Sequence, residues 1–164
     1  MAIKVIDKGW NKYITELKKS HISYSKVGFP IEADVKAGTQ KGSGHAPKES
    51  MIELSQLASI HEFGAPSKNI PARPFVRSAY DKNTENLHKM AEKELTSIRE
   101  NKSNIKKSLG RMGEFLTGQI KKEIKTGDFV PLKPETIKRK HSSRPLIDTA
   151  QMLQSVTHVE VINE

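Results

Sequence analysis

The dipeptide His61-Glu62 is the pattern in this sequence that comes nearest to a metal-dependent active site. In zinc proteases of the His-Glu-x-x-His type, a second histidine one helical turn later lets both imidazoles bind the same metal ion. Position 65 is Ala, so the second ligand is missing. None of the six histidines has another histidine four residues away. We therefore assign no metal, and interpret His61 as a histidine near a helix end that makes hydrogen bonds or contacts the helix dipole.

Other catalytic patterns are also missing from the sequence. The chain has no cysteine, which excludes disulfides, thiolate metal sites and cysteine nucleophiles. It has no Gly-x-Ser-x-Gly elbow and no phosphate-binding loop that ends in Lys-Ser or Lys-Thr. Acidic pairs such as Glu92 and Glu94 lie among lysines, where surface charge is the usual role. The sequence therefore predicts a protein that is not an enzyme and binds no cofactor.

Positive charge dominates the chain, which carries 28 Lys and Arg against 19 Asp and Glu, a formal net charge of +9. This excess favours an acidic partner or nucleic acid, although the cations are spread along the chain and form no dense basic arm. Non-specific DNA proximity stays open, because contacts to the phosphate backbone need only cations. The alternative is an ordinary solvated basic surface. The candidate basic contacts are Lys36, Lys41, Lys48, Lys138, Arg139 and Lys140.

The hydrophobic pattern predicts an α+β fold in one domain spanning residues 1–164. Apolar residues at helical spacing predict helices over about 7–20, 50–63, 75–99 and 103–126. Alternating residues predict short strands near 22–29 and 156–162, and these should pair because neither is stable alone. We expect a small antiparallel sheet packed on helices and backed by the helix 50–63. The two long helices at about 75–126 should form an extended hairpin or arm.

Several local signals refine these elements. Ser50 and Glu53 have the spacing of a capping box at a helix start. Ser103 is expected to cap the following helix and Gly127 to end it. The loop 36–48 is rich in glycine and lysine and has little to bury, so we expect it to be flexible. No apolar run approaches the roughly 18–20 residues that span a bilayer, so no membrane association is expected.

The first motif of interest joins a helix to an extended turn, in Ala58–Gly64 followed by Ile70–Val76. Each proline pushes the preceding residue out of the helical region, which stiffens the turn. Arg73 is expected to tie the turn to Glu62 or to a helix C-terminus, and Phe63 and Phe75 to anchor its two sides in the core. A structural clamp and a subunit contact are both consistent with this motif. Its candidate residues are His61, Glu62, Phe63, Gly64, Pro71, Arg73, Pro74 and Phe75.

The second motif covers Pro131–Lys140 and Pro145–Val156, with Leu146, Asp148 and Thr149 as its candidate residues. Together the two motifs resemble those of tailed-phage virion morphogenesis proteins, the group of minor tail, neck and tail-completion proteins. The resemblance spans more than half of the chain. It departs from the family at Ala150, where the family usually has glycine, so the backbone there is expected to form a different turn or a regular helix start.

This resemblance implies a structural component of a phage or prophage particle that acts in tail completion or head–tail joining. The implied partners are connector, tail-tube or tail-terminator subunits, and the chain is expected to form a homo-oligomeric ring on assembly. The implied location is the virion, and the host cytoplasm during assembly. Two alternatives remain, a basic DNA-binding accessory protein and a small hydrolase without a recognised motif.

Overall fold

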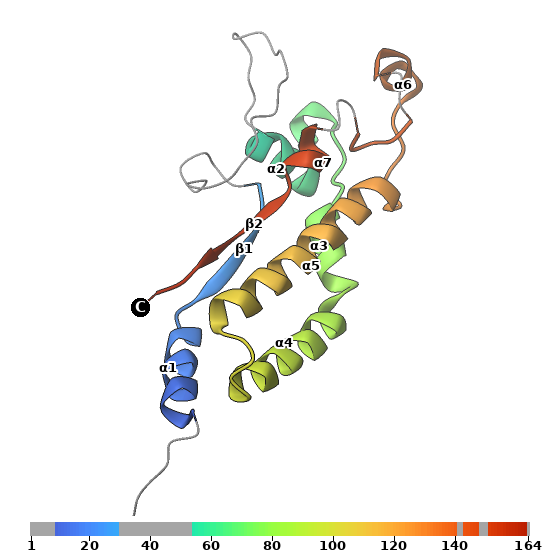
Figure 1. Cartoon of the computed structure of the whole chain (residues 1–164). Helices are drawn as coiled ribbons and strands as arrows, with labels where there is room; N and C mark the ends of the chain where they lie inside the picture. The colour runs from blue at the N-terminus through green and yellow to red at the C-terminus, as the bar shows by residue number, and fades with distance from the viewer. Residues whose placement is uncertain (1–8, 30–53, 141–142, 148–150, 164) are drawn as a thin grey trace, which may run out of the picture.

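A long central helix organises the chain. The computed structural model describes residues 9–29, 54–140, 143–147 and 151–163. Figure 1 shows α5 running between the two strands on one side and α3 and α4 on the other. In chain order the elements are α1 (Trp10–Ser20), β1 (Tyr24–Gly28), α2 (Leu54–Phe63), the 3-10 turn η2 (Pro66–Lys68), α3 (Phe75–Asp81), α4 (Thr84–Arg99), α5 (Ile105–Thr126), α6 (Pro134–Lys140), α7 (Gln151–Ser155) and β2 (Thr157–Val161).

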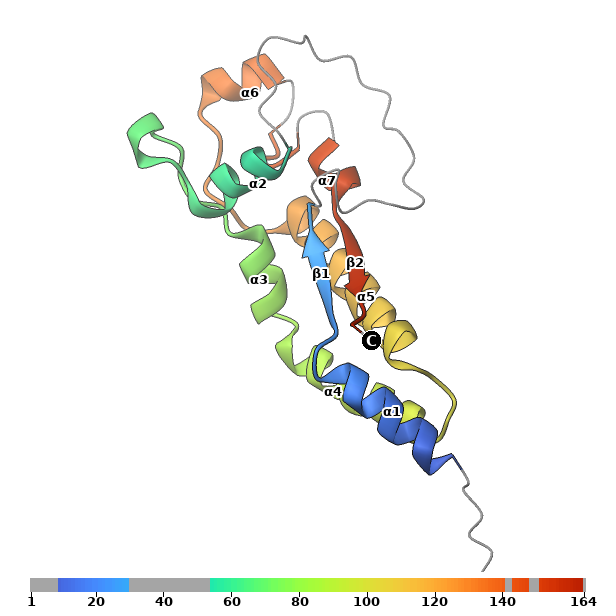
Figure 2. The same ribbon diagram turned by 90° about the vertical axis from the view of Figure 1, so that its left-hand side faces the viewer.

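The sheet joins segments from the two ends of the chain. β1 and β2 pair antiparallel, with Tyr24 opposite Val161 and Gly28 opposite Thr157. Figure 2 shows the two strands side by side in front of α5. The predicted pairing is therefore confirmed, and so is the α+β class, a small antiparallel sheet packed on helices.

The helix that backs this sheet differs from the expected one. Both strands pack on α5, whereas α2 packs mainly on α3 and α7. A side chain added at Gly113 of α5 would lie 2.6 Å from Ser25 Oγ and 2.8 Å from His158 Cδ2. Ser25 and His158 therefore face α5, and the glycine lets helix and sheet approach closely. The prediction that the helix 50–63 backs the sheet was wrong, because α5 packs against both strands.

This close approach gives a stability prediction with a control in the same helix. Overpacking at a tight contact costs about 1–3 kcal/mol. This exceeds the roughly 0.5–1 kcal/mol that alanine gains over glycine inside a helix. Gly113→Ala is therefore expected to lower the free energy of unfolding, as measured by urea denaturation. Gly118→Ala should raise it, because nothing lies within 4 Å of the added methyl group. If both substitutions raised the free energy of unfolding, α5 and the sheet would be packed less closely than the contacts at Gly113 indicate.

The predicted helix over 75–99 is two helices, because α3 ends at Asp81 and α4 begins at Thr84. Asn83 Nδ2 donates to the backbone oxygen of Ala79, and Thr84 Oγ1 donates to that of Tyr80. Such local side-chain bonds to the backbone compete with a regular helix. α3 and α4 both still pack against α5. α5 is thus a core helix that contacts the sheet as well as one half of a hairpin.

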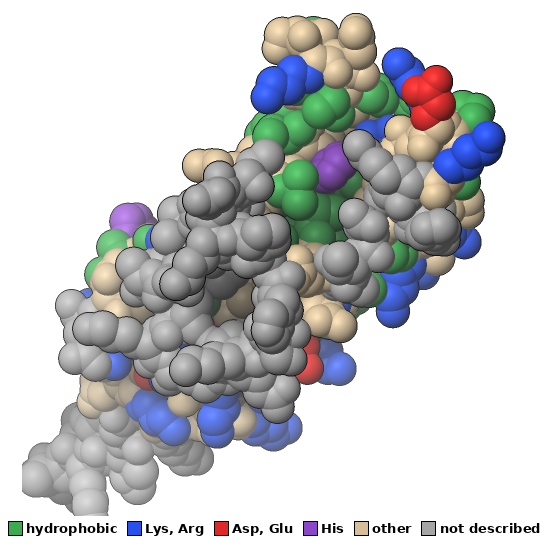
Figure 3. All heavy atoms as spheres, turned by 90° about the horizontal axis from the view of Figure 1, so that it is seen from above, with side chains coloured by type: hydrophobic (Ala, Val, Ile, Leu, Met, Phe, Trp, Pro, Cys, Tyr) green, Lys and Arg blue, Asp and Glu red, His purple; other side chains and the backbone are tan. Residues whose placement is uncertain are grey.

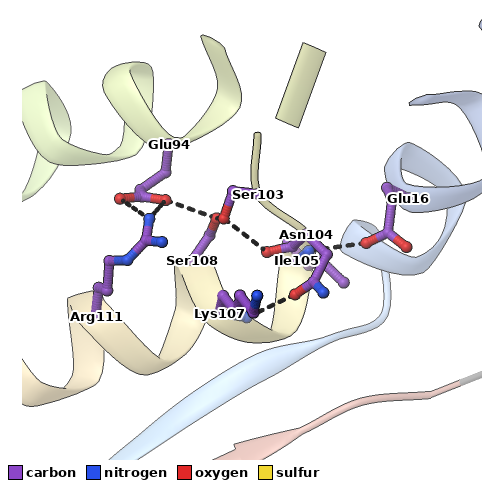
Figure 4. A network of polar contacts seen from close by, with 8 residues as sticks. All are labelled: Glu16, Glu94, Ser103, Asn104, Ile105, Lys107, Ser108 and Arg111. Atoms are coloured by element: carbon purple, nitrogen blue, oxygen red, sulfur yellow. Dashed lines mark hydrogen bonds and ion pairs between the residues drawn. The ribbon is translucent and has the colours of Figure 1, made fainter. Parts of the chain in front are cut away.

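Figure 4 shows the polar network at the turn between α4 and α5. The Glu94 carboxylate accepts hydrogen bonds from Arg111 Nη1 at 2.6 and 2.8 Å and from Ser108 Oγ at 2.8 Å. Asn104, not the predicted Ser103, caps α5, with its side chain accepting the backbone N–H of Lys107. Glu16 of α1 accepts the backbone N–H of Ile105 at 2.8 Å, so α1 is attached at the same helix start.

Glu94 is buried in this network, so the interpretation of Glu94 as a surface charge was wrong. Its carboxylate makes stability depend on pH. Burial alone would raise the pKa of Glu94, but hydrogen bonds from Arg111 and Ser108 and the charge of Arg111 outweigh it and hold the pKa below its usual 4.5. A lowered folded-state pKa contributes stability at higher pH, and this contribution is lost as the pH falls through the folded-state value. Wild-type protein should therefore be more stable than Glu94→Gln near neutral pH, with the difference shrinking below 4.5. Denaturation of both proteins across that range tests this, and a pH-independent difference would contradict it.

Candidate interaction site

The first motif folds into a tight reversal at the end of α2. Gly64 ends the helix with φ 77°, and a side chain there would lie 2.8 Å from the backbone nitrogen of Ala72. The chain then turns through η2, and Ala65 pairs with Ile70 in an isolated antiparallel bridge. Glycine is needed at position 64 for both the positive φ and the close backbone approach.

Glu62 and Arg73 hold this turn through separate contacts. The Glu62 carboxylate accepts the backbone N–H groups of Val76 at 2.9 Å and Arg77 at 3.0 Å, which satisfies the start of α3. Arg73 is buried and its Nε donates to the backbone oxygen of Val130 at 3.2 Å. Arg73 thus ties the turn to the chain beyond α5, and the expected contact to Glu62 or a helix C-terminus was wrong. Burial lowers the pKa of the Arg73 guanidinium, which nevertheless stays protonated because its usual value is so high.

The two phenylalanines of the motif have different environments. Phe75 is 0% exposed, whereas Phe63 is 67% exposed. The expectation that both anchor the turn in the core is correct for Phe75 and wrong for Phe63. Phe63 is the last residue of α2, where its side chain lies at the rim of the surface described below.

The second motif meets the first in the hydrophobic core. Leu146 is buried in the same cluster as Phe75, and Met152 of α7 and Val156 belong to it as well. Segments distant in the sequence therefore form one packed unit. Lys138 is exposed on α6, where Arg139 and Lys140 follow it. The other candidates, Asp148, Thr149, Lys36, Lys41 and Lys48, lie outside the described residues, as do Ala150 and the predicted capping box at Ser50 and Glu53.

An open groove of about 560 Å³ lies beside this unit. Apolar side chains from four elements line it, and the aromatic rings of Phe63 and Tyr80 are exposed at 67% and 48%. Figure 3 views the molecule from the end that holds α2, α6 and α7, where hydrophobic side chains gather around a histidine, with Lys and Arg nearer the edges of this face. The lining residues are Val27 and Phe29 of the β1 segment, Ser55, Ala58, Ser59, Glu62 and Phe63 of α2, Val76, Arg77 and Tyr80 of α3, and Leu116 and Ile120 of α5.

The chemistry of the groove suits binding of a protein surface. The Glu62 carboxylate accepts hydrogen bonds from N–H groups of α3, whereas Arg77 is exposed and forms no ion pair with another described residue. An apolar floor with aromatic side chains and an arginine at its edge is typical of interface centres. The sequence did not identify Arg77 and Tyr80 as site residues, because helical spacing alone does not distinguish a core position from the rim of a groove.

Two further properties concern the described residues only. They contain no cluster of three His, Asp or Glu side chains that could hold a metal ion. Among their helices none has the length and apolar character needed to cross a membrane.

Comparison with known proteins gives one short similarity. An uncharacterized protein of Methanocaldococcus jannaschii is 48% identical over 42 residues, which are 26% of this chain and 31% of that protein. The chain thus covers less than a third of the length of this relative. No family model and no solved structure matches the chain.

Proposed function

We propose that this protein is a non-enzymatic structural component of a tailed phage or prophage particle that acts in tail completion or head–tail joining. The observation that carries the proposal is the packing of the two motifs that resemble virion morphogenesis proteins. Phe75 of the first and Leu146 of the second lie in one core cluster, beside an apolar groove. A pair of motifs that build one unit next to an exposed aromatic surface is expected of a subunit that docks onto others.

In this role the first motif and the helix after it have two separate tasks. The turn is held by Arg73, Glu62 and Phe75. The exposed side chains of Phe63 and Tyr80 would contact a neighbouring subunit. The neighbours we propose are connector, tail-tube or tail-terminator subunits, together with further copies of this chain in a ring. The protein would be found in the virion, and in the host cytoplasm during assembly.

Removal of the gene from the phage or prophage that encodes it tests this role. Electron microscopy of the lysate should then show heads and tails that have not joined. Complementation with the wild-type gene should restore complete particles. Complete, infectious particles without the protein would contradict the proposal.

A role in DNA binding is the second candidate, and the lysines at the end of α5 favour it. Lys122 and Lys125 are exposed there, and Lys133 and Lys138 are exposed in the following segment. Neutralising several phosphates releases counterions, so binding would fall steeply with salt. Strong, salt-dependent retention on duplex DNA, together with normal particles after gene removal, would favour this candidate. A small hydrolase is a weaker alternative. It would be favoured if the protein had a turnover activity that was lost when one acidic residue was replaced.

A further inference from the structure

One buried charge in the described part of the chain has no counterion. The charged side chains that are buried among the described residues are Arg73, Glu94 and Glu123. Glu94 forms an ion pair with Arg111, and Glu123 forms one with Lys82. Arg73 is 4% exposed and forms no ion pair with any described carboxylate. Charged groups are rarely buried without a partner, because burial removes their hydration.

The acidic residue of the first motif is already engaged elsewhere. The two oxygens of the Glu62 carboxylate accept the backbone N–H groups of Val76 and Arg77. Burial lowers the pKa of the Arg73 guanidinium, and no carboxylate charge acts against this effect. Within the described residues, the positive charge of Arg73 is therefore uncompensated.

Most hydrogen-bond donors of Arg73 are unused as well. A guanidinium has five N–H donors. Among the described residues only the Nε of Arg73 has a partner, the backbone oxygen of Val130 at 3.2 Å. Neither Nη group is among the side-chain atoms that are both sealed from solvent and without a partner. Both Nη groups therefore reach the surface, and their opening is narrow because the whole residue is only 4% exposed.

The unused donors suit a planar carboxylate. An arginine presents two parallel N–H groups that match the two oxygens of a carboxylate, and exclusion of water strengthens such a pair. The side chain of Val130 is 53% exposed and offers an apolar contact to the methylene groups of an aspartate or glutamate. Nucleic acid fits less well, because its phosphate backbone is bound through several cations rather than one recessed arginine.

We propose that the Nη groups of Arg73 bind a carboxylate from an aspartate or glutamate side chain of a neighbouring protein. This carboxylate would supply the counterion that the buried guanidinium lacks. The inference deepens the proposed structural role and rests on it only for the identity of the neighbour as a particle subunit.

Formate, the smallest carboxylate, tests the site in the isolated full-length protein. Sodium formate replaces sodium chloride at constant ionic strength, and the melting temperature is measured. Formate at ten times its dissociation constant would favour the folded state about elevenfold, which raises the melting temperature by about 3–6 °C. Arg73→Lys keeps the charge but removes the paired donors, so it should lose most of this rise. No rise in the wild type, or an equal rise in Arg73→Lys, would overturn the proposal.

Two further measurements separate the site from effects of charge and folding. Arg99→Lys makes the same replacement at an exposed arginine of α4 and should keep the full rise in melting temperature. If Arg73→Lys does not fold, nuclear magnetic resonance of the ¹⁵N-labelled wild type replaces it. The Nε–H signal of Arg73 should then shift saturably with formate, while that of Arg99 should not. An unresponsive Arg73 signal would count against the site.

A parallel titration with inorganic phosphate distinguishes the ligand classes. A response of Arg73 to phosphate but not to formate would overturn the carboxylate proposal and favour nucleic acid. The particle experiment is independent of these results. If formate does not bind but joined particles require the protein, this inference fails while the proposed function stands. If formate binds but complete particles form without the gene, the site stands and the proposed function fails.

Discussion

Replacing Phe75 by Ala is expected to lower the free energy of unfolding by about 3–5 kcal/mol, the usual cost of deleting a buried phenylalanine ring. Phe75 of the first motif is fully buried in the core cluster that also holds Leu146 of the second, and its ring contacts Phe29 edge-on at a centroid distance of 6.0 Å. The remaining cavity would separate the turn from Leu146 and the end of α5. Because many domains have only about 5–15 kcal/mol of stability, Phe75→Leu, which leaves a smaller cavity, provides a graded second variant. Urea denaturation measures both.

Phe63 is the matched control for this prediction. It lies in the same motif, yet its side chain is largely exposed, so Phe63→Ala should change the free energy of unfolding by no more than about 0.5 kcal/mol. Equal losses in the free energy of unfolding at the two positions would show that the end of α2 is buried in the folded protein and that Phe63 is not an exposed residue at the rim of the groove.

The different burial of these two phenylalanines could not be predicted from the sequence. Both flank the turn, and both are residues that proteins usually bury. The decisive difference is the direction of the chain after Gly64, which folds back over α2 and carries Phe75 into the core. That direction depends on tertiary contacts such as the one between Arg73 and Val130, 57 residues apart. No local pattern encodes such a contact.

Short-range signals located the elements more successfully. Alternation identified both strands, and their pairing followed because a lone short strand is unstable. Gly127 follows the last residue of α5, as expected. The identity of the helix behind the sheet was not predictable in this way. It depends on the fit of Gly113 to Ser25 and His158, a contact among three segments distant in sequence.

The second large effect is expected in particle assembly. Phe63→Ser removes an exposed ring from the groove while leaving the core unchanged, so the protein should fold normally but fail to support joining of heads and tails. Lys93→Ser, an exposed replacement on α4 away from the groove, is the control and should support normal assembly. If Phe63→Ser supports assembly fully, the exposed aromatic rim is not a subunit contact.

The measurement that tests the structural role most directly is a count of joined particles by electron microscopy after removal of the gene. Lysates are compared with no complementation and with complementation by the wild-type, Phe63→Ser and Lys93→Ser genes. If the protein is a particle component, the lysate without the gene should contain unjoined heads and tails. The wild-type and Lys93→Ser genes should restore joined particles, and the count with Phe63→Ser should stay close to that of the deletion. An undiminished count of joined, infectious particles in the deletion lysate would contradict the proposed role.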